Sequence, residues 1–221
     1  MPTDIAIDTF LTDEGFITPW ARHQSRTVLE QAGLTRKGKQ AMSSAKLVKA
    51  REYLSLYVVR VCGDPGCAAL AEVVKDGRLV VETRSTQCAI CGGSNNRRAA
   101  LLLGRACAAR SVTRLLILGG TPALHAELES LLVPTGLSLR CIDGASGAHA
   151  KTDALPNLNW AQVMAVWAST PLPHKVSVSY TDERPRDLPT VTVGRRGIEA
   201  LCNAVRQTVE GMPAATGPKT R

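Results

Sequence analysis

The sequence predicts an α/β protein in which a parallel sheet follows a four-cysteine segment and a helical unit. Short apolar runs alternate with helical patterns in the C-terminal half, as in parallel sheets with crossover helices. Two pairs of cysteines precede that half, and the N-terminal third has apolar residues at helical spacing. We therefore expect a basic helical unit over 1–61, a metal-binding segment over 62–96, an α/β domain over 97–210 and a disordered tail over 211–221.

The N-terminal third is expected to be mainly helical. Residues 1–16 show no clear period and are interpreted as a loose lead-in. Thr18 and Pro19 are typical of a helix start, which predicts a helix over 19–32. Apolar residues recur at helical spacing over 44–57, and the β-branched residues that follow predict a strand ending at the first cysteine of the metal-binding segment.

Four cysteines have the spacing of a metal site. They are Cys62, Cys67, Cys88 and Cys91, two pairs separated by twenty residues. Asp76-Gly77 between the pairs predicts a β-hairpin, which would bring the pairs together as in a zinc ribbon with structural Zn²⁺. The alternatives are an iron–sulfur site and a redox pair of Cys88 and Cys91 alone.

Other glycines and cysteines fit this interpretation. Gly63, Gly66, Gly92 and Gly93 flank the four cysteines, where the backbone has to turn tightly. The remaining cysteines, Cys107, Cys141 and Cys202, lie in apolar segments and are expected to be buried. The odd number of seven cysteines argues against a disulfide framework.

The C-terminal half is expected to alternate between helices and strands. The predicted helices cover 95–113, 121–136, 174–185 and 195–211, the strands cover 114–118, 137–142, 160–169 and 188–194, and 145–159 is predicted as a loop. Polar and small residues follow the strands, at the edge where open parallel sheets bind ligands. The candidate ligand-binding residues are Gly119, Gly120, Thr121, Asp143, Thr170, His174, Lys175, Arg195 and Arg196.

The charge pattern favours an anionic partner. The net charge is +8, and two long windows, 31–51 and 83–126, contain no acidic residue. Basic residues in such windows are typical of phosphate contacts with DNA or RNA. The candidate nucleic-acid-binding residues are Arg36, Lys37, Lys39, Lys46, Lys49, Arg97, Arg98 and Arg105.

The sequence shows no apolar run long enough for a membrane span and no signal-peptide pattern, so we expect a cytoplasmic protein without a membrane partner.

The C-terminal half also resembles a small bacterial family of Rossmann-like domains of unknown function. The segments "LLILGGTPALHAELESLLVPTGLSLRCIDG", "WAQVMAVWASTPLPHK" and "LPTVTVGRRGIEALCNAV" carry the resemblance, which covers about residues 114–208. Gly119, Gly120, His125 and His174 match its sharpest positions, whereas Pro173 replaces the Ser that precedes the histidine in that family. The resemblance implies a Rossmann-like fold and no settled activity.

Together these observations predict a zinc-containing nucleic-acid-binding or regulatory accessory protein rather than a self-sufficient enzyme. A place in a phage-defence or mobile-element complex, with protein partners, would suit such an architecture. One alternative is a nucleotide or small-ligand sensor or enzyme that uses the strand-end edge. Another is a non-catalytic assembly subunit.

Overall fold

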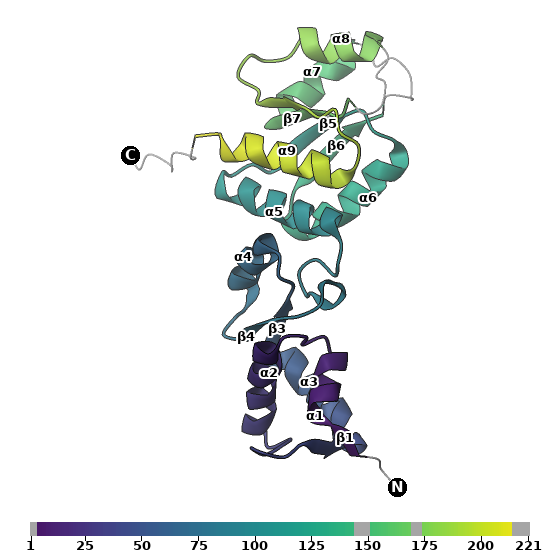
Figure 1. Cartoon of the computed structure of the whole chain (residues 1–221). Helices are drawn as coiled ribbons and strands as arrows, with labels where there is room; N and C mark the ends of the chain where they lie inside the picture. The colour runs from purple at the N-terminus through teal and green to yellow at the C-terminus, as the bar shows by residue number, and fades with distance from the viewer. Residues whose placement is uncertain (1–3, 144–150, 169–173, 214–221) are drawn as a thin grey trace, which may run out of the picture. The chain divides into compact units, whose positions relative to one another are not determined.

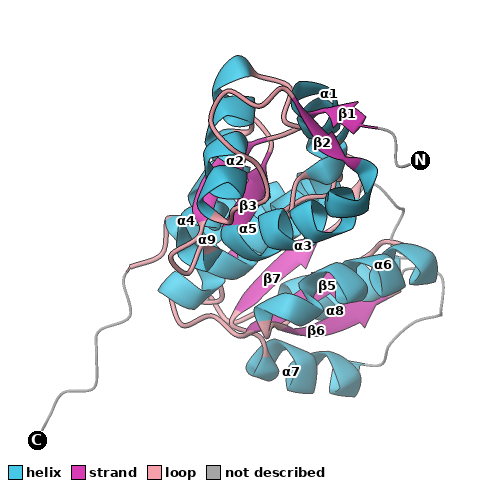
Figure 2. Ribbon diagram, turned by 90° about the horizontal axis from the view of Figure 1, so that it is seen from below, coloured by secondary structure: helices cyan, strands magenta, loops and turns pink. Residues whose placement is uncertain are grey.

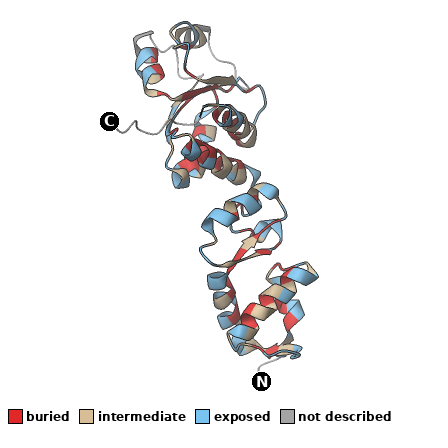
Figure 3. Cartoon of the chain, turned by 90° about the vertical axis from the view of Figure 1, so that its left-hand side faces the viewer, coloured by how far each residue is buried: buried red, intermediate tan, exposed pale blue. Residues whose placement is uncertain are grey.

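The chain divides into two compact units, Met1–Ser94 and Asn95–Arg221. The computed structural model describes residues 4–143, 151–168 and 174–213, with side chains from 154 and from 177 onwards in the last two ranges (Figure 1). Within each unit the buried positions line the inner faces of the helices and the strands (Figure 3). None of the helices in the described ranges combines the length and the apolar character needed to cross a membrane.

The first unit begins with three helices and a small antiparallel sheet. Its elements are β1 (Asp4–Ala6), α1 (Ile7–Asp13), α2 (Pro19–Gln31), β2 (Ala41–Ser43), the 3₁₀ turn η1 (Ser44–Lys46) and α3 (Leu47–Tyr57). The prediction of α2 is confirmed, and the Thr18 side chain caps it by accepting a hydrogen bond from the Ala21 amide. The expectation of a loose lead-in is wrong, because Ile7, Phe10 and Leu11 bury one side of α1 in the core.

The cysteine segment is a β-α-β unit and not a hairpin. Its elements are β3 (Val58–Val61), α4 (Pro65–Val74), β4 (Leu79–Glu82) and η2 (Ser85–Gln87), and β3 pairs with β4 in parallel. Asp64 caps α4, so the apolar run after it forms a helix. Asp76 and Gly77 have φ of 44° and 73° and form the turn from α4 to β4. Asp76-Gly77 therefore forms a turn, as its sequence indicates. The predicted hairpin is wrong, and so is the zinc-ribbon topology that depended on it.

The second unit has a mixed α/β fold built on a four-stranded parallel sheet in the order β6-β5-β7-β8. Its elements are α5 (Asn95–Ala109), β5 (Arg114–Leu118), α6 (Pro122–Leu132), η3 (Val133–Thr135), β6 (Ser138–Ile142), α7 (Lys151–Trp160), β7 (Val163–Val166), α8 (His174–Asp182), β8 (Thr190–Thr192) and α9 (Ile198–Glu210). The strands β5, β6 and β7 lie side by side (Figure 2). This arrangement confirms the predicted Rossmann-like α/β fold class.

Both faces of this sheet are covered. Leu115 and Ile117 of β5 pack with α5, α6 and α9, whereas Leu116 and Leu118 pack with α7 and α8 (Figure 1). This alternation explains why β5 reads as a continuous apolar run, since a strand buried on both faces has no polar side. The helix predicted over 174–185 is present as α8 but ends at Asp182, and its Tyr180 is fully buried.

Two predictions for this unit are wrong, and others fall on residues outside the described ranges. The predicted loop over 145–159 is wrong from Lys151 onwards, because α7 forms there and buries Ala154 and Leu158 despite Pro156 inside the helix. Strand β7 consequently starts at Val163 and not at 160. Residues 144–150 and the predicted disordered tail from 214 lie outside the described residues.

The Gly119-Gly120 turn after β5 is required by packing. Both residues have positive φ, 92° and 90°. A Cβ on Gly120 would lie 2.8 Å from Cε3 of Trp167 and 2.9 Å from Nε2 of His125. The His125 ring in turn contacts the Gly119 carbonyl oxygen through Nε2 at 2.7 Å. Two buried aromatic side chains therefore fill the space beneath the turn.

We predict that Gly120→Ala destabilises the second unit more than Gly136→Ala does. Both variants place a side chain at positive φ, which costs about 1–2 kcal/mol. Only Gly120→Ala adds a collision with Trp167 and His125, worth about 1–3 kcal/mol more, because a Cβ on Gly136 meets open space. Urea unfolding followed by circular dichroism would measure both, and equal losses would contradict this account of the turn.

Candidate metal centre

The four predicted cysteines converge in the first unit. The sulfur atoms of Cys62, Cys67, Cys88 and Cys91 all lie within 4.8 Å of one another, and all four residues are buried. The Sγ atoms of Cys62 and Cys91 are 3.8 Å apart. The structure thus confirms that these residues form a cluster able to hold a metal ion.

The sulfur positions fit tetrahedral coordination. Metal–sulfur bonds of about 2.3 Å in a tetrahedron place neighbouring sulfurs about 3.8 Å apart. The distance between the Cys62 and Cys91 sulfurs has this value, and the upper limit of 4.8 Å requires only small side-chain shifts. Four protein donors leave no open coordination position, so an ion held here would be structural and not catalytic.

Helix capping and a glycine turn position the sulfurs. The Asp64 carboxylate accepts hydrogen bonds from the amides of Gly66 and Cys67, at 2.8 and 3.3 Å, which fixes Cys67 in the first turn of α4. On the other side, the Gly93 amide donates to the Cys91 sulfur at 3.3 Å. Gly92 and Gly93 have φ of 57° and 84°, as a tight metal-binding turn requires.

The prediction of tight turns at glycine is therefore confirmed for Gly92 and Gly93. It is wrong for Gly66, which lies inside α4, and Gly63 is not among the residues with positive φ.

The thiols differ in how easily they lose a proton. Burial raises the pKa of Cys62, and burial together with hydrogen bonds to neighbouring thiols raises the pKa of Cys67 further. Burial also acts to raise the pKa of Cys88, but backbone hydrogen bonds from Cys91, Cys62 and Ile90 outweigh it and lower the value to about 7. An ion that binds four thiolates would displace the protons that burial retains.

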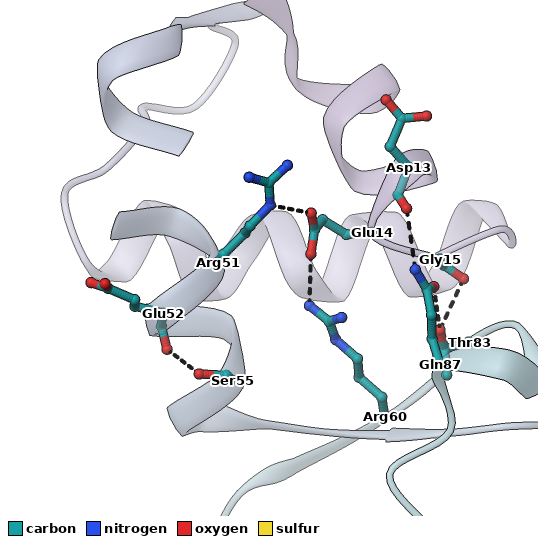
Figure 4. Close-up of polar contacts among 9 residues, drawn as sticks. All are labelled: Asp13, Glu14, Gly15, Arg51, Glu52, Ser55, Arg60, Thr83 and Gln87. Carbon is teal, nitrogen blue, oxygen red and sulfur yellow. Dashed lines mark hydrogen bonds and ion pairs between the residues drawn. The ribbon is translucent and has the colours of Figure 1, made fainter. Parts of the chain in front are cut away.

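Hydrogen bonds join the metal-binding loops to the N-terminal helices. The Thr83 hydroxyl donates to the Gly15 carbonyl at 3.1 Å, and the Gln87 side-chain amide donates to the Asp13 carbonyl at 3.3 Å (Figure 4). The Arg84 amide also donates to the Gly15 carbonyl at 3.1 Å. Gly15 follows α1, whereas Thr83 and Gln87 precede Cys88. The turn between α1 and α2 is thus held by the segment that leads into the second cysteine pair.

An ion-paired carboxylate strengthens the same junction. Glu14 is largely buried and accepts from Arg51 of α3 at 2.6 Å and from Arg60 of β3 at 3.1 Å (Figure 4). Arg60 also stacks on Phe16, and its carbonyl accepts from the Ala89 amide between the second pair of cysteines. Sequence reasoning missed this network because its members are 37 and 46 residues apart and have no local signature.

The remaining cysteines lie in the second unit. Cys107 and Cys202 belong to the core beneath α5 and α9, as predicted, whereas Cys141 of β6 is only half-buried. Burial raises the pKa of each of the three thiols to about 12, so they stay protonated near neutral pH.

The structure brings only part of the predicted strand-end group together. Gly119 and Asp143 end neighbouring strands, and the Gly119 amide donates to the carbonyl of Ile142. Thr121 caps α6. Arg195 and Arg196 are exposed after β8, two strands away from β5, and Arg195 lines a pocket of about 320 Å³ with residues of α9, apart from Gly119 and Asp143.

Three other strand-end candidates lie wholly or partly outside the described residues. Thr170 lies outside the described residues, and so do the side chains of His174 and Lys175, whose backbone begins α8.

The predicted basic residues occupy both units. Arg36, Lys37, Lys39, Lys46 and Lys49 are exposed in the first unit, around the connection from α2 to α3. Arg97 and Arg105 are exposed on α5 of the second unit, and Arg98 is half-buried and donates to the Asn95 side chain at 2.9 Å.

Comparisons with protein-family models, curated proteins and solved structures gave no match to this chain. The resemblances noted in the sequence therefore receive no support from them, and functional inference depends on the residues themselves.

We predict that the purified protein carries one tightly bound metal ion per chain and that Cys67→Ser loses it. A serine hydroxyl is a poor replacement for a buried thiolate ligand, and the first unit should then unfold at lower temperature. Native mass spectrometry and elemental analysis would measure the metal. Cys141→Ser is the matched control and should keep it, and full metal retention in Cys67→Ser would contradict the assignment.

We further predict that Glu14→Gln destabilises the first unit without removing the metal. A buried carboxylate that accepts charged hydrogen bonds contributes about 1–2 kcal/mol here, mainly through Arg60, because Arg51 is more than half exposed and solvent screens it. Chemical unfolding and metal analysis of the same sample would test this. Glu52→Gln, a change of an exposed side chain nearby, should have a much smaller effect.

Proposed function

We propose that this protein binds nucleic acid, DNA or RNA, through basic residues of its first unit, and that Zn²⁺ holds that unit together. The role fits an accessory or regulatory protein better than a self-sufficient enzyme. The closed four-sulfur shell leaves no position for a substrate, and buried aromatic side chains fill the space under the Gly119-Gly120 turn.

The observation that carries this proposal is that five cations between residues 36 and 49 are all exposed; they are here called the basic cluster and are Arg36, Lys37, Lys39, Lys46 and Lys49. The Lys46 ammonium donates to the Leu34 carbonyl at 3.3 Å, which ties the start of α3 to the loop after α2. Arg26 donates to the Lys39 carbonyl at 2.6 Å and pairs with Glu30. The loop that carries Arg36, Lys37 and Lys39 is therefore fixed at both ends.

Cations held in this way suit a polyanion. Phosphate contacts by lysine and arginine release counterions from nucleic acid, which gives affinity that depends little on sequence and strongly on salt. Arg97 and Arg105 of α5 offer further contacts from the second unit. Arg98 contributes less, because it is half-buried and bonded to Asn95.

Zinc is the ion that best suits the cysteine cluster. Four thiolates in a closed tetrahedron are typical of structural zinc sites, and zinc needs no redox partner. An iron–sulfur centre uses the same donors, but it would colour the protein. Absorption of the purified protein and its cobalt-substituted form would distinguish the two ions.

The test is fluorescence anisotropy with labelled single-stranded DNA, duplex DNA and RNA on metal-loaded protein, at low and at moderate salt. We expect binding that weakens steeply with salt. The variant Lys37→Ala/Lys39→Ala/Lys49→Ala should bind more weakly and should reduce the slope of log K against log salt by about one per lysine that contacts a phosphate.

The matched control is Arg186→Ala, which removes an exposed cation from a loop of the second unit. It should bind as the unmodified protein does. Absence of binding to all three nucleic acids at low salt would overturn the proposal.

A further inference from the structure

Two tyrosines of α3 lie against each other at the surface of the first unit. The ring centroids of Tyr53 and Tyr57 are 4.3 Å apart and the rings are tilted by 30°. Tyr57 is 50% exposed, although aromatic residues make up only 4% of the chain and would contribute most when buried. An exposed aromatic surface in a chain so poor in aromatic residues points to a partner with flat, apolar faces.

The tyrosines form one wall of a groove. The groove encloses about 320 Å³, and its opposite wall is α2, which contributes Gln24, Thr27 and Gln31 at helical spacing. Gly77 and Leu79 complete the lining together with Val28, and none of the lining residues is charged. The groove therefore pairs an aromatic wall with side-chain amides, which both donate and accept hydrogen bonds.

Lys49 of the basic cluster lies on the same helix as the aromatic wall, and Lys46 lies in the 3₁₀ turn directly before it. Lys46, Lys49, Tyr53 and Tyr57 follow one another at intervals of three and four residues, so they share one side of α3 and its first turn. The eight helical steps from Lys49 to Tyr57 span about 12 Å along the helix. This is the length of three to four stacked nucleotides at about 3.4 Å each.

We infer that the groove between α2 and α3 is a binding site for single-stranded nucleic acid, with a base stacked on the exposed ring of Tyr57, which Tyr53 supports from the core side, and the backbone held by Lys46 and Lys49. The inference depends on the proposed function and specifies its substrate. Duplex bases are stacked on each other and their faces are inaccessible, whereas a single strand can place a base on an exposed ring. The glutamines can meet base edges without demanding one sequence.

The competing occupant is a protein segment, and the chemistry of the lining favours the strand. A peptide groove would be expected to have an apolar floor, but three of the four residues that α2 contributes are polar. The exposed apolar side chains Leu56, Val73 and Val74 lie outside the lining.

The experiment uses the full-length, metal-loaded chain and a labelled oligothymidine strand, with a duplex of equal length for comparison. Tyr57→Leu keeps the apolar bulk but removes the aromatic face, and Tyr57→Phe keeps the face but removes the hydroxyl. We expect Tyr57→Leu to weaken single-strand binding about 5- to 100-fold and Tyr57→Phe to bind as the unmodified chain does. Duplex binding should be the same in all three proteins.

A second measurement does not depend on whether a variant folds. A strand that contains a photoreactive thymidine analogue, irradiated with the unmodified protein, should crosslink to Tyr57 or Tyr53, as read by peptide mass spectrometry. Crosslinks confined to other segments would overturn the inference.

The outcomes separate the two proposals. Unchanged single-strand binding by Tyr57→Leu, together with loss of binding in the triple lysine variant, would overturn the groove and leave the nucleic-acid function in place. Tighter binding of the duplex than of the single strand would also overturn the groove. Failure of the unmodified protein to bind any nucleic acid would overturn both.

Discussion

The convergence of four cysteine sulfurs is the constraint on which the first unit depends. Cys62 follows β3, Cys67 lies in the first turn of α4, and Cys88 and Cys91 lie in the turn after η2, so one ion would join the start of α4 to the segments that follow β3 and β4. Few large apolar side chains are available there: the buried positions of α4 are Cys67 and Ala71. Metal coordination would thus supply stabilisation that so small a core cannot provide.

This constraint extends beyond the cysteines. The segment before Cys88 holds the Gly15 carbonyl, and the Ala89 amide bonds to the carbonyl of Arg60, whose side chain binds Glu14. Glu14 also binds Arg51 of α3. Hydrogen bonds therefore link the metal-binding loop to the helix that carries Lys49 and the two tyrosines. Loss of the ion would therefore weaken the packing of helices that contain none of its ligands.

Local signals in the sequence were sufficient where neighbouring residues determine the structure. Thr18-Pro19 started α2, and the alternating elements of the second unit predicted its parallel sheet. Prediction failed where distant contacts decide. The apolar residues of α4 have a strand-like pattern, but the Asp64 cap starts a helix there. Helix α7 continues across Pro156 because Ala154 and Leu158 pack against one face of the sheet. The cysteine cluster was predictable from spacing, but the Glu14 network was not, since its partners meet only in the folded chain.

Only part of the net positive charge of the chain is available to a partner, because many of its arginines are engaged within the fold. Several arginines serve the fold: Arg26, Arg51, Arg60 and Arg206 pair with glutamates, and Arg22 and Arg78 donate to backbone carbonyls. Lys37, Lys39 and Lys49, by contrast, are exposed, and Lys49 lies on the helix that carries the tyrosine wall of the groove. A count of charges treats all these residues alike, whereas a bound strand would meet only those that are not already engaged. Because lysine is a flexible point charge and arginine a rigid fork, this division suits a surface that follows a phosphate backbone without reading its sequence.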